Sequence, residues 1–251
     1  MYADILRRND EVTLAMHGKS IISQFEACII LRSSHRQACL EFTHALDRLA
    51  KGESTLHDYE LFKSRYCTEL QDDEVSSFKD AIKLFPKRID VESHNMTVIE
   101  NLVDESKDHV PVARIPAKSS CAEASKASSE KAEGLEAQLH LSKGCKVTLR
   151  SNLWTEKGLV NGSIGNVDIL YEDGMSPPDF PPAVILCYFP SYAGPALVSN
   201  CSCNVVPIPP ITRTWTSSTG MSCARTQFPL QLCYAVSIHK SQGLTLEKVF
   251  N

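Results

Sequence analysis

The pattern of apolar residues changes near residue 139, and this change restricts the folds open to the 251-residue chain. Before it, short apolar runs alternate with amphipathic segments, which predicts strands and helices in turn. After it, short apolar runs separated by glycine and proline predict strands that follow one another directly. Alternation favours a parallel sheet, whereas consecutive strands favour a small barrel or sandwich. We therefore expect an α/β domain that carries an all-β insertion.

The first part contains three expected strands and three expected helices. The strands are expected at 26–31, 81–85 and 110–115, and the helices at about 40–49, 55–66 and 91–102. Gly52 is placed to end the first helix, and Thr55 with Asp58 resembles a capping box that begins the second. The stretch 117–134 is rich in Ser, Ala, Lys and Glu, so we expect a surface linker or an exposed helix there.

The second part predicts short strands and a closing helix. Strands are expected at 146–149, 164–170, 183–189 and 204–208. Apolar residues then recur with helical spacing from Leu232 to His239, which predicts a helix. A further strand is expected to begin at Lys248.

Composition excludes several classes of protein. No apolar run approaches the roughly 20 residues that span a bilayer, and the first residues lack an apolar signal core. The net charge of −4 argues against a large nucleic-acid surface but leaves room for a small local site. The ten cysteines are scattered, so free thiols are expected, and Cys201 with Cys203 lacks the partner pair of a zinc site.

A phosphate-binding loop is not expected at Gly18, Lys19 and Ser20. Such a loop needs another glycine five residues earlier, and Thr13 occupies that position. An ordinary helix start at Ser20 explains the triplet better.

The segment 237–246 carries the strongest chemical signal. Its polar side chains, His239, Lys240, Ser241 and Thr245, can contact phosphate oxygens, and Gly243 permits close backbone approach. The same residues also fit a helix C-terminus, with Lys240 near the helix dipole and Gly243 as the left-handed cap. Local chemistry alone leaves both interpretations open.

Aromatic residues in the second part offer a second route to nucleic acid, because aromatic rings stack on unpaired bases. The aromatic candidates are Trp154, Tyr171, Tyr188, Phe189, Tyr192 and Trp215. In a small barrel such residues belong more often to the core, and we favour that interpretation.

Residues 228–246 (FPLQLCYAVSIHKSQGLTL) resemble the fifth motif of the Pif-one-like family of 5′-to-3′ DNA helicases. Residues 30–65 resemble the family's fourth motif and its two helices. Residues 141–167 and 181–195 are similar to its inserted Src-homology-type β-barrel. These runs occur in the family's order over about 220 residues.

The resemblance implies roles for individual residues. Arg36 would approach the γ-phosphate of ATP, where a guanidinium can stabilise phosphoryl charge. Without the resemblance, Arg36 is an ordinary arginine at a helix start, and Gln37 a capping or packing residue. The implied nucleotide-coupling residues are Gln37, Gln242 and Gly243; the DNA-binding residues are His239, Lys240, Ser241 and Thr245; the barrel-turn residues are Gly158, Asn161 and Gly162.

The implied fold is an incomplete RecA-like parallel-sheet domain over 1–138 and 229–251, with the small barrel inserted at 139–228. The family enzyme uses ATP and Mg²⁺ and translocates on single-stranded DNA. We expect no metal site among the residues of this chain. The family also implies a nuclear location and work in DNA repair, recombination and telomere maintenance. No membrane partner is expected.

The phosphate-binding loop, the acidic magnesium motif and the sixth motif of that family do not occur in these 251 residues. We therefore expect the isolated chain to bind ATP unstably, to bind DNA weakly and to lack activity without an N-terminal RecA-like domain as partner. Two alternatives stay open. The chain could be a non-enzymatic module that binds single-stranded DNA or a protein, or a relic of a helicase-like transposon.

Overall fold

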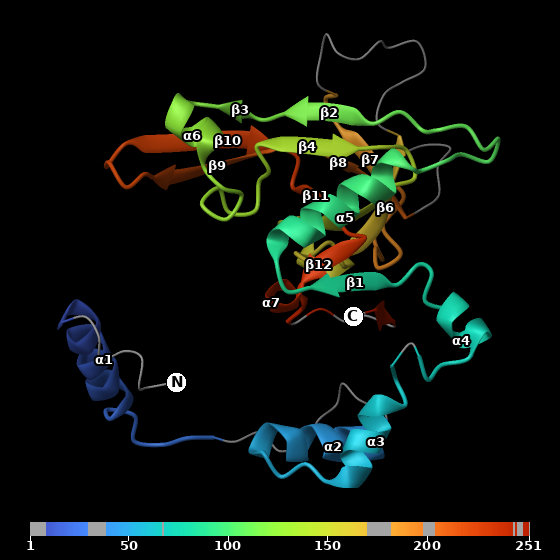
Figure 1. The fold of residues 1–251 in the computed structure, drawn as a ribbon. Helices are drawn as coiled ribbons and strands as arrows, with labels where there is room; N and C mark the ends of the chain where they lie inside the picture. The colour runs from blue at the N-terminus through green and yellow to red at the C-terminus, as the bar shows by residue number, and fades with distance from the viewer. Residues whose placement is uncertain are drawn as a thin grey trace. The chain divides into compact units, whose positions relative to one another are not determined.

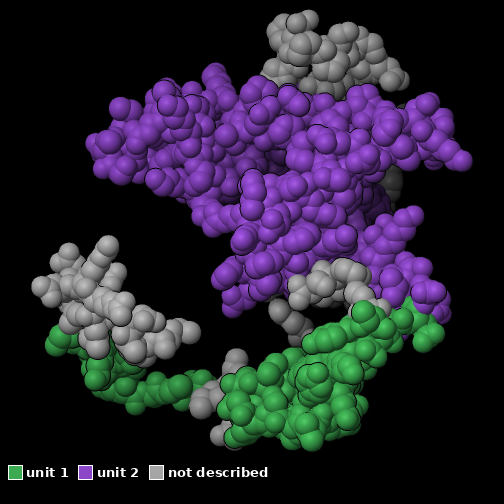
Figure 2. Space-filling view, in the orientation of Figure 1, with its two compact units in different colours: residues 1–71 green, residues 72–251 purple. Residues whose placement is uncertain are grey.

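The computed structural model describes residues 9–29, 39–66, 68–169, 182–197, 204–242, 244 and 248–250. Contacts divide the chain into two compact units, residues 1–71 and 72–251, which Figure 2 colours separately. Each unit is described by itself.

Unit 1 contains the helices α1 (Asn9–Ile22), α2 (Leu40–Lys51) and α3 (Leu56–Lys63). The expected end of α2 is confirmed, because Gly52 adopts the left-handed conformation with φ of 73°. A strand was expected at 26–31, but residues 26–29 are exposed and form none. The described part of unit 1 offers no strand with which they could pair. The remainder of that expected strand lies outside the described residues.

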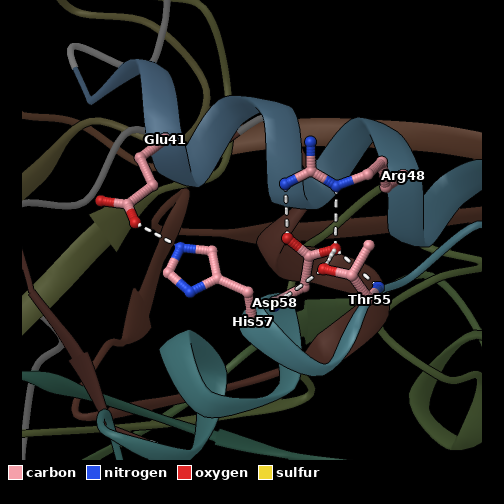
Figure 3. A network of polar contacts seen from close by, with 5 residues as sticks. All are labelled: Glu41, Arg48, Thr55, His57 and Asp58. Carbon is pink, nitrogen blue, oxygen red and sulfur yellow. Dashed lines mark hydrogen bonds and ion pairs between the residues drawn. The ribbon is translucent and has the colours of Figure 1, made fainter.

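The predicted capping box between α2 and α3 is confirmed, and it is tied to α2 by an ion pair (Figure 3). The Asp58 carboxylate accepts from the backbone N–H of Thr55 at 2.8 Å. It also accepts from Nε and Nη2 of Arg48 at 2.8 and 2.5 Å. The Arg48 guanidinium, together with the Thr55 N–H, holds the pKa of Asp58 far below its usual range. A bidentate pair of this kind fixes the two helices in one orientation.

Unit 2 contains a three-stranded parallel sheet with β1 (Ile82–Phe85) at its centre. β1 pairs on one side with β12 (Ala235–Ser237) and on the other with β13 (Val249–Phe250). The short helix α4 (Asp72–Ser76) precedes β1, and α5 (Arg88–Glu100) follows it and contacts both β1 and β12. The expected strand at 81–85 and helix at 91–102 are confirmed.

Two expectations about this region were wrong. The strand expected at 110–115 is β2 (Ala113–Pro116), which pairs antiparallel with β4 (Gln138–Leu141) and takes no part in the parallel sheet. The helix expected from Leu232 to His239 is two strands, β11 (Leu230–Leu232) and β12, followed by the single turn α7 (Ile238–Ser241). Spacing of i, i+3 and i+4 also fits two short strands with a turn between them, and pairing with β1 decides for strands.

The expected strands of the second part form a five-stranded antiparallel sheet in the order β11-β5-β6-β7-β8. The strands are β5 (Lys146–Leu149), β6 (Ile164–Ile169), β7 (Ile185–Tyr188) and β8 (Val205–Ile208). Together with β11, these strands supply half of the main buried hydrophobic cluster of unit 2. Within the described residues, β11 and β8 lie at opposite edges without pairing to each other, so this sheet is not closed into a barrel.

A third sheet joins β3 (Lys118–Ser119), β10 (Ser222–Gln227) and β9 (Ile211–Thr216), as the upper part of Figure 1 shows. The helix α6 (Ala122–Lys126) follows β3 and contacts β10. The stretch 117–134 was expected on the surface, yet Ala124 and Ala132 are fully buried. They are buried because this stretch wraps the side chain of Arg225, which donates to the carbonyl oxygens of Ala124 and Ala127 at 2.5 and 2.7 Å.

Candidate nucleic-acid interface

Asn95 on α5 fixes the turn that leads from β11 into β12. Its Oδ1 atom accepts from the backbone N–H groups of Tyr234 and Ala235 at 3.0 and 2.8 Å. Its Nδ2 atom donates to the carbonyl oxygen of Ala235 at 3.3 Å. Asn95 is buried, so these bonds are shielded from water. The start of β12, and with it the position of α7, is therefore set by one side chain from a helix about 140 residues earlier.

α7 begins where β12 ends. The Oγ atom of Ser237 accepts from the backbone N–H of Lys240 at 3.4 Å, which makes Ser237 the N-cap of this turn. His239 and Gln242 are exposed, whereas Lys240 and Ser241 are half-buried. The Ser241 hydroxyl donates to the Ile238 carbonyl at 2.7 Å. His239 thus presents its ring to solvent, while Lys240 points toward the body of unit 2.

Lys240 lines a pocket of about 260 Å³ between α5, the stretch 127–137 and the strands β11 and β12. The wall opposite includes Glu136, whose carboxylate accepts from the Gln231 side chain at 3.1 Å. Arg88 at the start of α5 also lines the pocket and forms an ion pair with Glu130. The pocket therefore combines two cations with two carboxylates, the half-buried Glu136 and the exposed Glu92.

The electrostatics of the pocket couple Lys240 to Glu136. Burial lowers the pKa of Lys240, the neighbouring Arg150 and Arg88 act in the same direction, and Glu136 opposes them. Burial likewise raises the pKa of Glu136, and Lys240 opposes that rise. An ammonium that is partly withdrawn from water, among other cations, gains strongly from a nearby anion. A phosphate group and the Glu136 carboxylate would compete to be the anion that stabilises the charged form of Lys240.

The turn around Gly158 and Gly162 lines a separate pocket of about 970 Å³. Gly158 has φ of 82°, and a Cβ there would collide with the carbonyl oxygen of Ser191. Gly162 has φ of 96° and lies against the side chain of Leu244. Glycine is required at both positions, because other residues rarely adopt this backbone conformation. Leu244 is the described residue after α7 that lies against this turn.

Two lysines line the second pocket, and both are held by backbone carbonyls. The Nζ atom of Lys146 donates to the carbonyl of Asp80 at 2.8 Å. The Nζ atom of Lys248 donates to the carbonyl of Ser77 at 3.3 Å and lies 5.3 Å from the Phe78 ring centroid. Lys146 thus ties β5 of the five-stranded sheet to the residues that precede β1. Lys248, directly before β13, ties the parallel sheet to the same residues.

Comparison with curated proteins finds helicases. No family model matches the chain. The ATP-dependent DNA helicase PIF1 of Xenopus laevis is 37% identical over 112 residues, which are 45% of this chain and 15% of the relative. The human PIF1 helicase is 34% identical over 143 residues, 54% of this chain and 19% of the relative. The matches thus cover about half of this chain and less than a fifth of those relatives.

Solved structures agree in fold. The Pif1 helicase of Candida albicans superposes with a TM-score of 0.60 and 20% identity, covering 87% of this chain and 48% of that chain. Unliganded Pif1 from Bacteroides gives 0.55 and 23%, covering 86% and 44%. Bacteroides Pif1 bound to single-stranded DNA gives 0.55 and 20%, covering 93% and 51%. This chain resembles the Pif1 helicases in sequence and in fold. Its Pif1-like fold is a mixture of helices and sheets that matches about half of those structures.

The Pif1-like structure brings some predicted site residues together and separates others. Lys240 lines the smaller pocket; the larger one is lined by Gly158, Asn161 and Gly162. His239, Ser241 and Gln242 lie on α7 or directly after it but line neither pocket. The predictions for Arg36, Gln37, Gly243 and Thr245 lie outside the described residues.

Sequence reasoning missed three polar residues of the smaller pocket or its surroundings, Glu136, Arg88 and Arg150. Each belongs to a different segment, and none carries a local motif that would mark it. Only the structure shows that Asn95 holds the start of β12.

The aromatic side chains divide between core and surface. Phe189 and Tyr192 are buried, as expected for core residues. Trp154 and Tyr188 are 37% and 38% exposed, so their rings are accessible in part. Tyr171 lies outside the described residues.

Two further searches of the described residues gave negative results. They contain no group of three or more His, Cys, Asp or Glu side chains placed to hold a metal ion. None of the helices that the structure describes has both the length and the apolar character needed to cross a bilayer.

Proposed function

We propose that these residues form most of the second RecA-like domain of a Pif1-like, ATP-dependent 5′-to-3′ DNA helicase. The observation that carries the proposal is the position of α7. It starts at the carboxyl end of β12, beside β1 in a parallel sheet, and ligands of open α/β sheets bind at that end of the strands. The strands β5 to β8 would be the core of the inserted barrel, with residues 139–228 as its span, and β11 would begin the return to the RecA-like domain.

In this proposal α7 contacts the phosphates of single-stranded DNA. Lys240 supplies the positive charge, and the exposed His239 and half-buried Ser241 supply further hydrogen-bonding groups. Contacts of this kind hold a strand without reading its sequence, which suits a translocating enzyme. Thr245 would extend the same surface.

ATP and Mg²⁺ belong to the complete enzyme in this proposal. The bound nucleotide would supply the phosphoryl chemistry whose free energy drives movement along DNA. Arg36 would hold the γ-phosphate, while Gln37, Gln242 and Gly243 would relay its presence to the DNA contact. Since no phosphate-binding loop occurs in the sequence, the isolated 251-residue chain should neither hydrolyse ATP nor unwind DNA.

The DNA contact is tested by fluorescence anisotropy with a labelled single-stranded oligonucleotide at several salt concentrations. We expect weak, salt-dependent binding that Lys240→Ala weakens further, with a salt slope reduced by about 0.7 if one phosphate contact is lost. Lys126→Ala is the matched control, because Lys126 is an exposed lysine on α6 outside both pockets. Equal affinity of the wild type and Lys240→Ala for the oligonucleotide would contradict the proposal that α7 contacts DNA.

The activity of the isolated chain is tested separately, by phosphate release from ATP with and without single-stranded DNA. We expect no release above the background of a mock purification. DNA-stimulated hydrolysis that co-purifies with the chain would contradict the proposal that the catalytic phosphate-binding loop belongs to another domain.

A further inference from the structure

Cys121 and Cys223 face each other across the third sheet of unit 2. Their sulfur atoms are 3.8 Å apart, although the residues are 102 positions apart in the sequence. Cys121 directly precedes α6 and is half-buried, and Cys223 lies on β10 and is fully buried. The described residues offer these two sulfurs no third metal-binding side chain, so a metal site does not explain the pair.

The strand register explains why the two sulfurs meet. β3 and β10 pair antiparallel, with Ser119 opposite Arg225. Continuing that register by two residues places Cys121 opposite Cys223. The pair between them, Ser120 and Ala224, is hydrogen-bonded, because the N–H of Ser120 donates to the Ala224 carbonyl at 2.9 Å.

Cys121 stands just beyond the paired residues of β3, at the position that faces Cys223 in this register. Its sulfur is 3.8 Å from the sulfur of Cys223, whereas a disulfide bond is about 2.05 Å long. Closing the bond therefore requires the two sulfurs to approach by about 2 Å.

The surroundings of the two thiols differ in a way that favours stepwise oxidation. The Sγ atom of Cys121 accepts from the Ala124 N–H at 3.4 Å, and this contact lowers the pKa of Cys121. Burial raises the pKa of Cys223. Cys121 is therefore the partly accessible sulfur with more thiolate character, and Cys223 is the shielded sulfur beside it. Reactivity toward oxidants follows thiolate character and exposure.

We propose that Cys121 and Cys223 are an oxidation site, at which a peroxide converts the two thiols into a disulfide. The Cys121 thiolate attacks the peroxide, an S–O bond forms, the O–O bond breaks, and water or an alcohol leaves after protonation. The Cys223 sulfur then attacks the resulting sulfenic acid. The S–S bond forms, the S–O bond breaks, and the hydroxyl leaves as water with the proton of Cys223.

The disulfide would tie α6 and β3 covalently to β10. The chain between the two cysteines includes β4, β5, β6, β7, β8 and β9, so the closed loop would contain four of the five strands of the five-stranded sheet. Closing a loop of this length restricts the unfolded chain and stabilises the folded one. The inference concerns the third sheet and does not depend on the proposed helicase function.

The test uses the complete 251-residue protein, treated with hydrogen peroxide and then with N-ethylmaleimide to block remaining thiols. Proteolysis and mass spectrometry without reductant should find one cross-linked peptide pair, containing Cys121 and Cys223, that is lighter by two hydrogen atoms and separates on reduction. Cys145 and Cys233 provide an internal comparison, because burial raises the pKa of each to about 11. They should stay reduced under the same treatment.

Cys121→Ser is the matched variant, because a serine oxygen can replace sulfur as the acceptor that caps α6. In it, Cys223 should stay reduced, and the rise in unfolding midpoint that peroxide gives the wild type should be lost. Two results would overturn the proposal. One is a native protein in which Cys121 and Cys223 both react with N-ethylmaleimide after peroxide. The other is a cross-link that forms only after denaturation.

Discussion

Arg225 is the most constrained side chain of unit 2. It is 0% exposed, and its guanidinium nitrogens donate to the backbone carbonyls of Leu135, Ala124 and Ala127 rather than to a carboxylate. Trp215 covers it, with the ring centroid 5.9 Å from Cζ. Burial lowers the pKa of Arg225, with Glu136 acting in the opposite direction. A buried cation of this kind is costly unless its donors are satisfied. Here the two Nη atoms organise the stretch 122–135, whereas Nε has no hydrogen-bond partner among the described residues.

We expect Arg225→Met to destabilise the protein by at least about 2 kcal/mol, because several buried carbonyls lose their donors at once. Urea unfolding followed by circular dichroism measures this. Arg213→Met is the matched control, since Arg213 stands directly opposite Arg225 in the β9–β10 ladder and is one-third exposed. Its loss should cost less than about 1 kcal/mol. Equal effects of the two variants would mean that the carbonyl contacts of Arg225 contribute little.

Removing the charge of either Lys240 or Glu136 should shift the pKa of the other residue. Glu136→Gln removes a charge that raises the pKa of Lys240, so that pKa should fall further below its usual value. Lys240→Met removes a charge that lowers the pKa of Glu136, so the pKa of Glu136 should rise further. NMR detection of the Lys240 side chain and of the Glu136 carboxyl measures both. Glu92→Gln is the opposite-sign control, because the Glu92 charge raises the pKa of Glu136 and its removal should lower that pKa.

At the scale of elements, α7 depends on α5 for its position. β12 is three residues long and α7 four, so neither has much stability of its own. Asn95 holds the turn before β12 through both ends of its amide, and β1 holds the other side of the strand. The position of the proposed DNA contact is therefore set by α5 and β1 rather than by the stability of α7 itself.

Asn95→Ala should cost about 2 kcal/mol, because two buried backbone N–H groups lose their acceptor. It should also change the amide NMR signals of Ala235 and Lys240 more than those of β5. Asn101→Ala is the control, since Asn101 is exposed at the end of α5 and bonds only within that helix, to Thr97. Unchanged signals from α7 in Asn95→Ala would show that β1 alone positions it.

The sequence predicted those helix ends that are set by residues only a few positions away. Gly52 ends α2, and Thr55 with Asp58 begins α3, as expected. Elements that depend on distant partners were predicted less well. β12 was predicted to be part of a helix, because its partner β1 lies about 150 residues away. β2 was predicted to join the parallel sheet, because its antiparallel partner β4 was not recognised as a strand. The pocket around Lys240 was missed for the same reason, since Glu136 and Lys240 line it together but lie about 100 residues apart in the sequence.

At the scale of the whole molecule, the hydrophobic core of unit 2 is self-contained. All buried members of its main cluster fall between residues 99 and 232, so none comes from unit 1. A chain of residues 72–251 should therefore fold alone, with the same urea midpoint for the five-stranded sheet as the full chain. Amide NMR spectra of both proteins check this, and loss of dispersion in the shorter chain would show that unit 1 is needed.

The order of the parallel sheet has a consequence for how the chain is made. β1 lies between β12 and β13, yet the register of Lys83 with Ala235 means that its first partner is synthesised about 150 residues later. At roughly 5–20 residues per second on a ribosome, β1 waits on the order of ten seconds with both edges unpaired. Chaperones that bind extended apolar segments would meet this strand first, and the surface that carries α7 would be the last part of unit 2 to assemble.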